Sequence, residues 1–278
     1  MTEPLRRWFG LDGKVALVTG AGANGGIGHA IALALAEAGA NLLVSDADEA
    51  GAQATAREVE ARGRTAVATR CDLGRPDDVL ALMAVADRAF PTLDILVNNV
   101  GVGHRSRPEE LSLEDWQAVV RVNLDGTFLV TREVGRRMIR GGRGGSIVSI
   151  SSIAGSSALG RGNFVYSVTK GGILQMTREL SVEWAPHRIR VNAIQPAQVM
   201  TRAMERMLAD PRLDPPSLKA RFVRGIPLDR IGEPEDVAWA TVFLCSAAAG
   251  FVTGHALPVD GGNLALNAGG SKVWPTDP

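Results

Sequence analysis

The sequence is poor in histidine, cysteine and aromatic residues. Its 278 residues include four histidines and two cysteines, and aromatic residues make up only 5%. The cysteines, Cys71 and Cys245, form neither a disulfide framework nor the spacing of a metal site. We interpret each cysteine as a small core residue and expect no metal centre.

Positive and negative side chains are equal in number, so neither sign of charge is in excess. Thirty Lys and Arg residues balance thirty Asp and Glu residues, and the sequence pI is about 6.9. The chain therefore lacks the basic excess that binds nucleic acid or an anionic membrane. Long apolar runs are also missing, both of the length of a membrane span and of the length of a signal peptide. We expect a soluble, cytoplasmic protein that binds neither nucleic acid nor membranes.

Short apolar runs alternate with longer amphipathic stretches along the chain. Strands are expected at Lys14–Thr19, Asn41–Asp46, Thr65–Arg70, Asp94–Asn98, Ser146–Ile150, Arg188–Ile194 and Ala256–Val259. Helices are expected at Gly28–Ala38, Ala47–Arg62, Pro76–Phe90, Leu113–Arg140, Tyr166–Ala185 and Glu233–Ala247. Alternating units with nearly continuous apolar strands predict an α/β fold, a doubly wound parallel sheet of about seven strands with helices on both faces.

No linker or shift in composition divides the chain, so we expect one domain over residues 1–278. A stretch at about 200–227 is rich in Met, Arg and Pro and is expected to form a small helical lid over one end of the sheet. Met200, Met204 and Met207 recur there at helical spacing, which suits either an apolar lid face or a helix packed on the body. A C-terminal tail follows at about 263–278.

The only tyrosine, Tyr166, lies four residues before Lys170. On a helix these positions share one face, so the phenol and the ammonium can converge. A nearby cation favours phenolate and lowers a phenol pKa that is about 10 when unperturbed. Such a phenol can donate or accept a proton near neutral pH. The alternative is a half-buried tyrosine beside a surface lysine.

Glycines gather between the first expected strand and the first expected helix. Gly20, Gly22 and Gly25 match G-x-G-x-x-G, and Gly26 with Gly28 adds a second G-x-G where the helix begins. Glycines allow close approach of a pyrophosphate, and the helix N-terminus offers free N–H groups. The segment predicts a dinucleotide site; the alternative is a glycine-rich turn without a ligand.

Asp46 ends the second expected strand, 18 residues after Gly28. A carboxylate at this place can accept hydrogen bonds from both ribose hydroxyls of NAD, and it repels the 2′-phosphate of NADP. No Arg or Lys follows it closely or lies in the glycine loop, so NAD is the expected cofactor. The alternative for Asp46 is a helix N-cap, for which Asp48 is the better candidate.

Six further segments occur in a distinctive order. They are Cys71-Asp72-Leu73, Asn98-Asn99-Val100-Gly101, Val122-Asn123-Leu124, Ser149–Gly155, Arg190–Pro196 and Val259–Gly262. With the glycine loop they resemble the short-chain dehydrogenase/reductase family, a single-domain Rossmann fold, from about Leu11 to Asn263. The chain departs from the family pattern by two extra residues in the glycine loop, by Val100 in place of alanine, and by Ala197 after Pro196 in place of glycine.

The resemblance implies an oxidoreductase that transfers hydride between NAD(H) and a secondary alcohol or ketone. Tyr166 would exchange the proton, and Lys170 would bind the nicotinamide ribose and lower the Tyr166 pKa. Ser152 would hold the substrate oxygen, with Ser151 as the alternative serine. Asn123 would hold a water that links Lys170 to solvent.

Cofactor contacts are also implied, Asp72 at the adenine amine and Thr201 at the nicotinamide amide among them. The full set is Gly20, Asn24, Gly26, Ile27, Gly28, Asp46, Asp72, Leu73, Asn99, Gly101, Tyr166, Lys170, Pro196, Val199 and Thr201. A homotetramer is expected by the same resemblance, with its larger interface on Leu113–Arg140 and Tyr166–Ala185.

The substrate pocket is expected between Val102–Arg107, Ala154–Phe164 and the Met200–Gly225 part of the lid. Arg105, Arg107 and Arg161 could meet an anionic substrate or could be ordinary solvated arginines. His104 could touch substrate or be a loop histidine. Three other functions stay open: a non-catalytic dinucleotide-sensing module, a 3-oxoacyl-thioester reductase of the same family, and an epimerase or dehydratase of the longer relatives.

Overall fold

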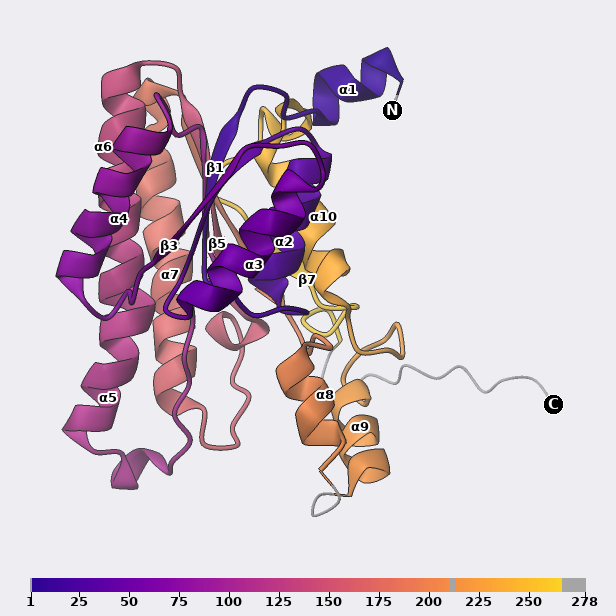
Figure 1. The fold of residues 1–278 in the computed structure, drawn as a ribbon. Helices are drawn as coiled ribbons and strands as arrows, with labels where there is room; N and C mark the ends of the chain where they lie inside the picture. Colours follow the sequence, from indigo (N-terminus) through magenta and orange to yellow (C-terminus); the bar gives the residue numbers. More distant parts are fainter. Residues whose placement is uncertain (1, 211–213, 267–278) are drawn as a thin grey trace.

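A parallel sheet of seven strands forms the centre of the computed structural model, which describes residues 2–210 and 214–266 (Figure 1). The strands are β1 Val15–Thr19, β2 Asn41–Asp46, β3 Ala66–Arg70, β4 Ile95–Asn98, β5 Gly145–Ile150, β6 Ile189–Pro196 and β7 Ala256–Val259. Their order across the sheet is β3-β2-β1-β4-β5-β6-β7, and all neighbours pair in parallel.

Helices cover both faces of the sheet (Figure 1). One layer holds α2 Ile27–Glu37, α3 Glu49–Glu60 and α10 Pro234–Cys245; the other holds α4 Pro76–Ala89, α6 Thr127–Gly141 and α7 Phe164–Glu183. The remaining α-helices are α1 Glu3–Phe9, α5 Leu113–Val120, α8 Arg202–Leu208 and α9 Pro215–Val223. Short 3₁₀ turns lie at Pro108–Glu110, Ile153–Gly155, Ala185–His187 and Ala247–Ala249, and a π segment at Arg121–Gly126. The predicted fold class is confirmed.

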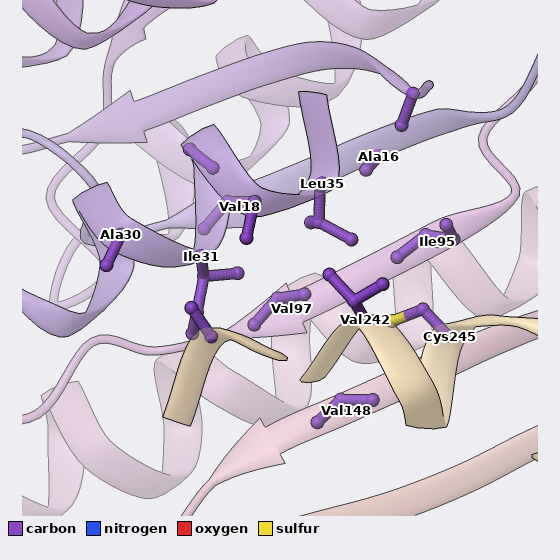
Figure 2. Close-up of a cluster of buried hydrophobic side chains, with 14 of the residues drawn as sticks. Ala16, Val18, Ala30, Ile31, Leu35, Ile95, Val97, Val148, Val242 and Cys245 are labelled. Atoms are coloured by element: carbon purple, nitrogen blue, oxygen red, sulfur yellow. The ribbon is translucent and has the colours of Figure 1, made fainter. Parts of the chain in front are cut away.

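The first strand shows how the core is divided between the two layers. Val15 and Leu17 pack into the cluster that includes α4 and α6, whereas Ala16 and Val18 pack into the cluster that includes α2 and α10. Figure 2 shows Val18 near Ile31 of α2. Because successive side chains of a strand point to opposite faces, a strand covered on both faces must be apolar throughout. This explains the continuous apolar runs in the sequence.

Two elements differ from the sequence-based expectation. The long helical stretch expected over Leu113–Arg140 is helical throughout, but a π segment that was not expected lies between α5 and α6. Helix α1 was not expected, because none of its residues is buried and its sequence therefore carries no core-facing pattern. The lid expected at about 200–227 consists of α8 and α9, and residues 267–278 of the expected tail lie outside the described residues.

The strand order creates a crevice at the carboxyl ends of β1 and β4. In the sheet, β2 pairs with one side of β1 and β4 pairs with the other side. Open α/β sheets bind ligands at such a reversal of strand order. Helices α8 and α9 lie beyond this edge of the sheet (Figure 1). None of the helices in the described part of the chain combines the length and hydropathy that crossing a membrane requires.

Candidate active site

The glycine loop joins β1 to α2 and is tied to the end of β4. The Asn99 side-chain amide donates to the Gly20 carbonyl at 2.8 Å, and the Asn99 backbone N–H donates to the Thr19 hydroxyl at 3.2 Å. A Cβ on Gly28 would overlap both the Gly20 carbonyl oxygen and the Asn99 amide. Glycine at position 28 is therefore required for α2 to begin this close to the end of β1.

Asp46 lies against the glycine loop and does not cap a helix. Its carboxylate accepts the Gly22 N–H at 2.8 Å and the Asp48 N–H at 2.9 Å. Asp48 occupies the N-cap position of α3, although its side chain makes no capping hydrogen bond. Each carboxylate oxygen of Asp46 keeps a second lone pair, so hydroxyl groups of a ligand could still donate to it.

A cleft of about 920 Å³ opens beside the loop. Seven of the expected cofactor residues line it: Gly20, Asn24, Gly26, Ile27, Gly28, Asn99 and Thr201. Asp72 and Leu73 do not line it, but the Cys71 N–H donates to the Asp46 carbonyl at 2.8 Å and so places them beside the end of β2. Val199 also lies outside this cleft: its side chain is buried in the core, which leaves only its backbone for a ligand.

Lys170 places its ammonium in the interior of the site. The residue is only 3% exposed, and Nζ donates to the Ile150 carbonyl at 2.8 Å. Burial lowers the pKa of this ammonium from its ordinary 10.5 to about 8. A Cβ on Gly101 would lie 3.0 Å from Nζ and 4.0 Å from Asn123 Oδ1. Because Gly101 has no side chain, the space next to the ammonium stays open on this side.

Tyr166 meets both Lys170 and Ser152. Lys170 Nζ lies 5.6 Å from the centre of the phenol ring, and the Ser152 hydroxyl is placed to favour the phenolate by hydrogen bonding. Burial raises the pKa of Tyr166, and the Ser152 hydrogen bond offsets part of the rise. This differs from the expected lowering by Lys170: Nζ is directed at the Ile150 carbonyl, and loss of hydration is the main cause of the shift in the phenol pKa.

The two candidate serines point in different directions. Ser151 donates its hydroxyl to the Lys170 backbone carbonyl at 2.9 Å and so serves to hold α7 on β5. Ser152 instead accepts the Ala154 N–H at 3.1 Å and bonds to Tyr166. Of the pair, the geometry favours Ser152 as the serine that would face a substrate oxygen.

Asn123 is fully buried within the π segment. Its Oδ1 accepts the Val102 N–H at 2.9 Å, while its amide donates to the Val102 carbonyl at 2.9 Å and to the Thr169 hydroxyl at 3.0 Å. Both amide hydrogens are thus engaged, and the side chain could hold a water only as an acceptor. The π turn matters because such segments rotate one residue out of helical register, here into the site.

Three residues with a place in this site were missed by the sequence analysis. Thr169 bridges Asn123 to the Tyr166 carbonyl, to which it donates at 2.8 Å. Gln195, on β6, donates to the Ser152 carbonyl at 3.1 Å. Arg202, on α8, lines the cleft. The only available signal was their proximity in sequence to Lys170, Pro196 and Thr201.

Two of the three walls expected around a substrate, Val102–Arg107 and Ala154–Phe164, contact each other. The Ser106 N–H donates to the Gly162 carbonyl at 3.3 Å, and the place of a Gly103 Cβ is 3.9 Å from the Tyr166 ring. His104 Nδ1 lies 3.7 Å from the Asp115 carboxylate. The arginines Arg105, Arg107 and Arg161 are exposed. No group of three or more His, Cys, Asp or Glu residues within 2–210 and 214–266 is arranged to hold a metal ion.

The site fits a nicotinamide dinucleotide. Gly101 leaves the approach to Lys170 Nζ open, Gly26 at the N-cap of α2 provides no side-chain cap, and the Asp46 carboxylate lies against the loop, where it accepts the Gly22 N–H. Free N–H groups at a helix N-terminus bind phosphate oxygens. Lys170 reaches the same edge at the end of β5, where its Nζ donates to the Ile150 carbonyl, and Tyr166 lies beside it.

Comparison with known proteins agrees with this geometry. Residues 20–263 match the family model described as "Enoyl-(Acyl carrier protein) reductase". D-threitol dehydrogenase of Mycolicibacterium smegmatis is 39% identical over 91% of this chain and 94% of its own. A 3-oxoacyl-[acyl-carrier-protein] reductase of Aquifex aeolicus is 38% identical over 91% and 98%.

Solved structures match along nearly the whole chain. A gluconate 5-dehydrogenase of Burkholderia cenocepacia, in complex with NADP and tartrate, has a TM-score of 0.85 and 34% identity over 94% of this chain and 99% of its own. A 7α-hydroxysteroid dehydrogenase complexed with NADH has a TM-score of 0.85 and 33% identity over 94% and 98%. The chain belongs to the short-chain dehydrogenase/reductase family and is an oxidoreductase.

Because Tyr166 is the only tyrosine, its ionisation can be followed without interference from another phenol. Ser152→Ala removes the hydrogen bond that favours phenolate, so we expect the pKa of Tyr166 to rise further. Ser151→Ala is the matched control, because the Ser151 hydroxyl bonds to a backbone carbonyl, and it should leave the titration nearly unchanged. The measurement is tyrosinate absorbance against pH. Equal titration curves for the wild type and Ser152→Ala would contradict the assignment.

Proposed function

We propose that the protein is an NAD(H)-dependent dehydrogenase of secondary alcohols, or the ketone reductase of the reverse direction. The observation that supports the proposal most is the gathering of Ser152, Tyr166, Lys170 and Asn123 near Gly101, which follows β4 at the same sheet edge as the glycine loop. A sensing module would not need a buried ammonium next to a hydrogen-bonded phenol. The structures of relatives with NADP and with NADH support a nicotinamide dinucleotide as the cofactor.

Each side chain has a separate task in this mechanism. A bound nicotinamide dinucleotide would accept or supply the hydride. Ser152 orients the substrate oxygen, and Tyr166 gives that oxygen a proton in reduction or removes one in oxidation. Burial keeps the phenol protonated at neutral pH, so the free protein holds the proton that ketone reduction consumes. Lys170 would hold the ribose; its Nζ donates to the Ile150 carbonyl, and Asn123 bonds to Thr169 on the same helix as Tyr166 and Lys170.

Reduction of a 3-oxoacyl thioester is the second candidate. The Aquifex aeolicus relative and the description of the matched family model favour it, and the same four side chains would serve. Exposed Arg105, Arg107 and Arg161 near the site could meet an anionic carrier. A panel of secondary alcohols, ketones and 3-oxoacyl thioesters, followed through the absorbance of NADH, separates the two candidates.

Tyr166→Phe tests the catalytic assignment with the best substrate of that panel. The substitution keeps the ring and removes only the proton donor, so the dissociation constant for NADH should stay close to that of the wild type. Turnover should fall about 10³-fold or more, because the phenol acts as a unit with Ser152. The assay is steady-state kinetics, with calorimetric titration of NADH as the binding control. Retention of more than about a tenth of the wild-type kcat would remove Tyr166 from the mechanism.

The preference for NAD rests on Asp46. Its carboxylate can accept ribose hydroxyls, and it faces a 2′-phosphate as a like charge. Lost charge-assisted hydrogen bonds cost about 1.5–3 kcal/mol, so kcat/KM should favour NADH over NADPH by about 10²-fold. Asp46→Asn with Ala47→Arg keeps an acceptor for the Gly22 N–H, removes the negative charge and adds a positive one. We expect this variant to shift toward NADPH.

Asp48→Asn is the control for that experiment, since Asp48 lines the cleft whereas the bond to the Gly22 N–H is made by Asp46. It removes the same charge and should leave the ratio of the two cofactors near the wild-type value. Wild-type kcat/KM for NADPH equal to or above that for NADH would overturn the role of Asp46.

We propose a homotetramer as the functional assembly. Large apolar side chains are exposed on the outer helices, including Leu113 at 71%, Phe128 at 46% and Val182 at 74%. Monomeric proteins rarely leave many such residues uncovered on neighbouring elements. Light scattering at micromolar concentration should give four times the chain mass of 29.3 kDa, and a monomer mass would contradict the assembly.

A further inference from the structure

The glycine loop contains no cation of its own. Residues 20–28 include neither Arg nor Lys, and α2 has no side-chain cap at its beginning. A dinucleotide brings at least two phosphate charges to this place. The N–H groups of the loop can bind phosphate oxygens but cannot neutralise them. Any side-chain cation that contacts these phosphates therefore comes from another part of the chain.

Arg202 of the lid lies directly against this loop. A Cβ on Gly25 would be 2.9 Å from Arg202 Cγ and 3.6 Å from both Cδ and Nε, so the stem of the arginine packs on the bare face of Gly25. Gly25 has φ +71°, a left-handed conformation that a side chain would strain. The loop is two residues longer here than in the family pattern, and this extension is the part that Arg202 reaches.

The Arg202 guanidinium is available for a ligand. It is exposed, and no carboxylate within the described ranges of the chain forms an ion pair with it. The cleft is not basic as a whole, since Arg202 and Arg206 are matched by Asp48 and Glu205 in its lining. Arg206 directs its Nε to the Arg202 backbone carbonyl at 3.3 Å. Among the charged residues of the cleft lining, contact with the extended glycine loop singles out Arg202.

We propose that Arg202 is a phosphate-binding residue of the cofactor site: carried by lid helix α8, it clamps a phosphate group of the dinucleotide against the extended glycine loop. Arginine presents a planar fork of N–H donors that matches phosphate oxygens. Because α8 carries this clamp, bound cofactor holds the lid over the edge where Tyr166 and Ser152 lie. This inference rests on the proposed dinucleotide-dependent function.

Calorimetric titration of NADH and NADPH into the full-length protein tests the clamp without requiring turnover. Arg202→Ala should weaken binding about ten- to hundredfold, the range for a charge-assisted hydrogen bond, and Arg202→Lys should recover part of the loss. Arg221→Ala, an exposed arginine of α9 outside the cleft lining, removes the same charge and should change affinity little. The wild type should also lose more affinity with added salt than Arg202→Ala.

A comparison of NADH with NADPH identifies which phosphate group Arg202 binds. Equal weakening of NADH and NADPH would assign Arg202 to the shared pyrophosphate, and weakening of NADPH alone would assign it to the 2′-phosphate. Either result supports a phosphate clamp. If Arg202→Ala binds both cofactors as tightly as Arg221→Ala does, the clamp is wrong. If the wild type itself binds neither dinucleotide, the proposed function fails and the clamp fails with it.

Discussion

The buried ammonium of Lys170 is the constraint on which the site depends. A charge with 3% exposure is costly in a protein interior, and its pKa of about 8 expresses that cost. The surroundings are arranged to tolerate it: the Ile150 carbonyl accepts from Nζ, Gly101 leaves its side unfilled, and the Tyr166 ring lies nearby. We interpret this as stability given up for a cation at the proton-transfer centre.

The parallel sheet determines which residues can gather around that ammonium. Carboxyl ends of parallel strands share one edge, so the ends of β1, β2, β4, β5 and β6 bring distant segments together. Hydrogen bonds from helical residues then fix the side chains of the site relative to one another. Thr169 links the Asn123 amide to the backbone of Tyr166, so the π segment and α7 are held in a fixed relation. Gln195 fixes the loop of Ser152 from the neighbouring strand.

Much of this could be predicted from sequence because it depends on local pattern. Apolar runs located the strands, and Asp46, expected at the end of the second strand, is the last residue of β2 and lies against the glycine loop. Features that arise from tertiary contact could not be predicted in this way. The π segment has no periodicity of its own, and Arg202 meets Gly25 only because the lid folds back over the sheet edge. The direction of the Tyr166 pKa shift depends on burial, which spacing to Lys170 does not reveal.

The pH dependence of stability tests the central claim, that Lys170 is charged at a cost within the site. Its folded pKa of about 8 lies below the ordinary 10.5, so between these values the unfolded chain binds more protons and stability rises with pH. Urea unfolding of the wild type and Lys170→Met, compared from neutral pH upward, isolates this residue because other titrations cancel in the difference. Between pH about 8 and 10.5, the unfolding free energy of the wild type should rise relative to that of Lys170→Met by up to about 3 kcal/mol. A difference that stays constant with pH would show that the ammonium is not buried at a cost, and the account of the site would be wrong.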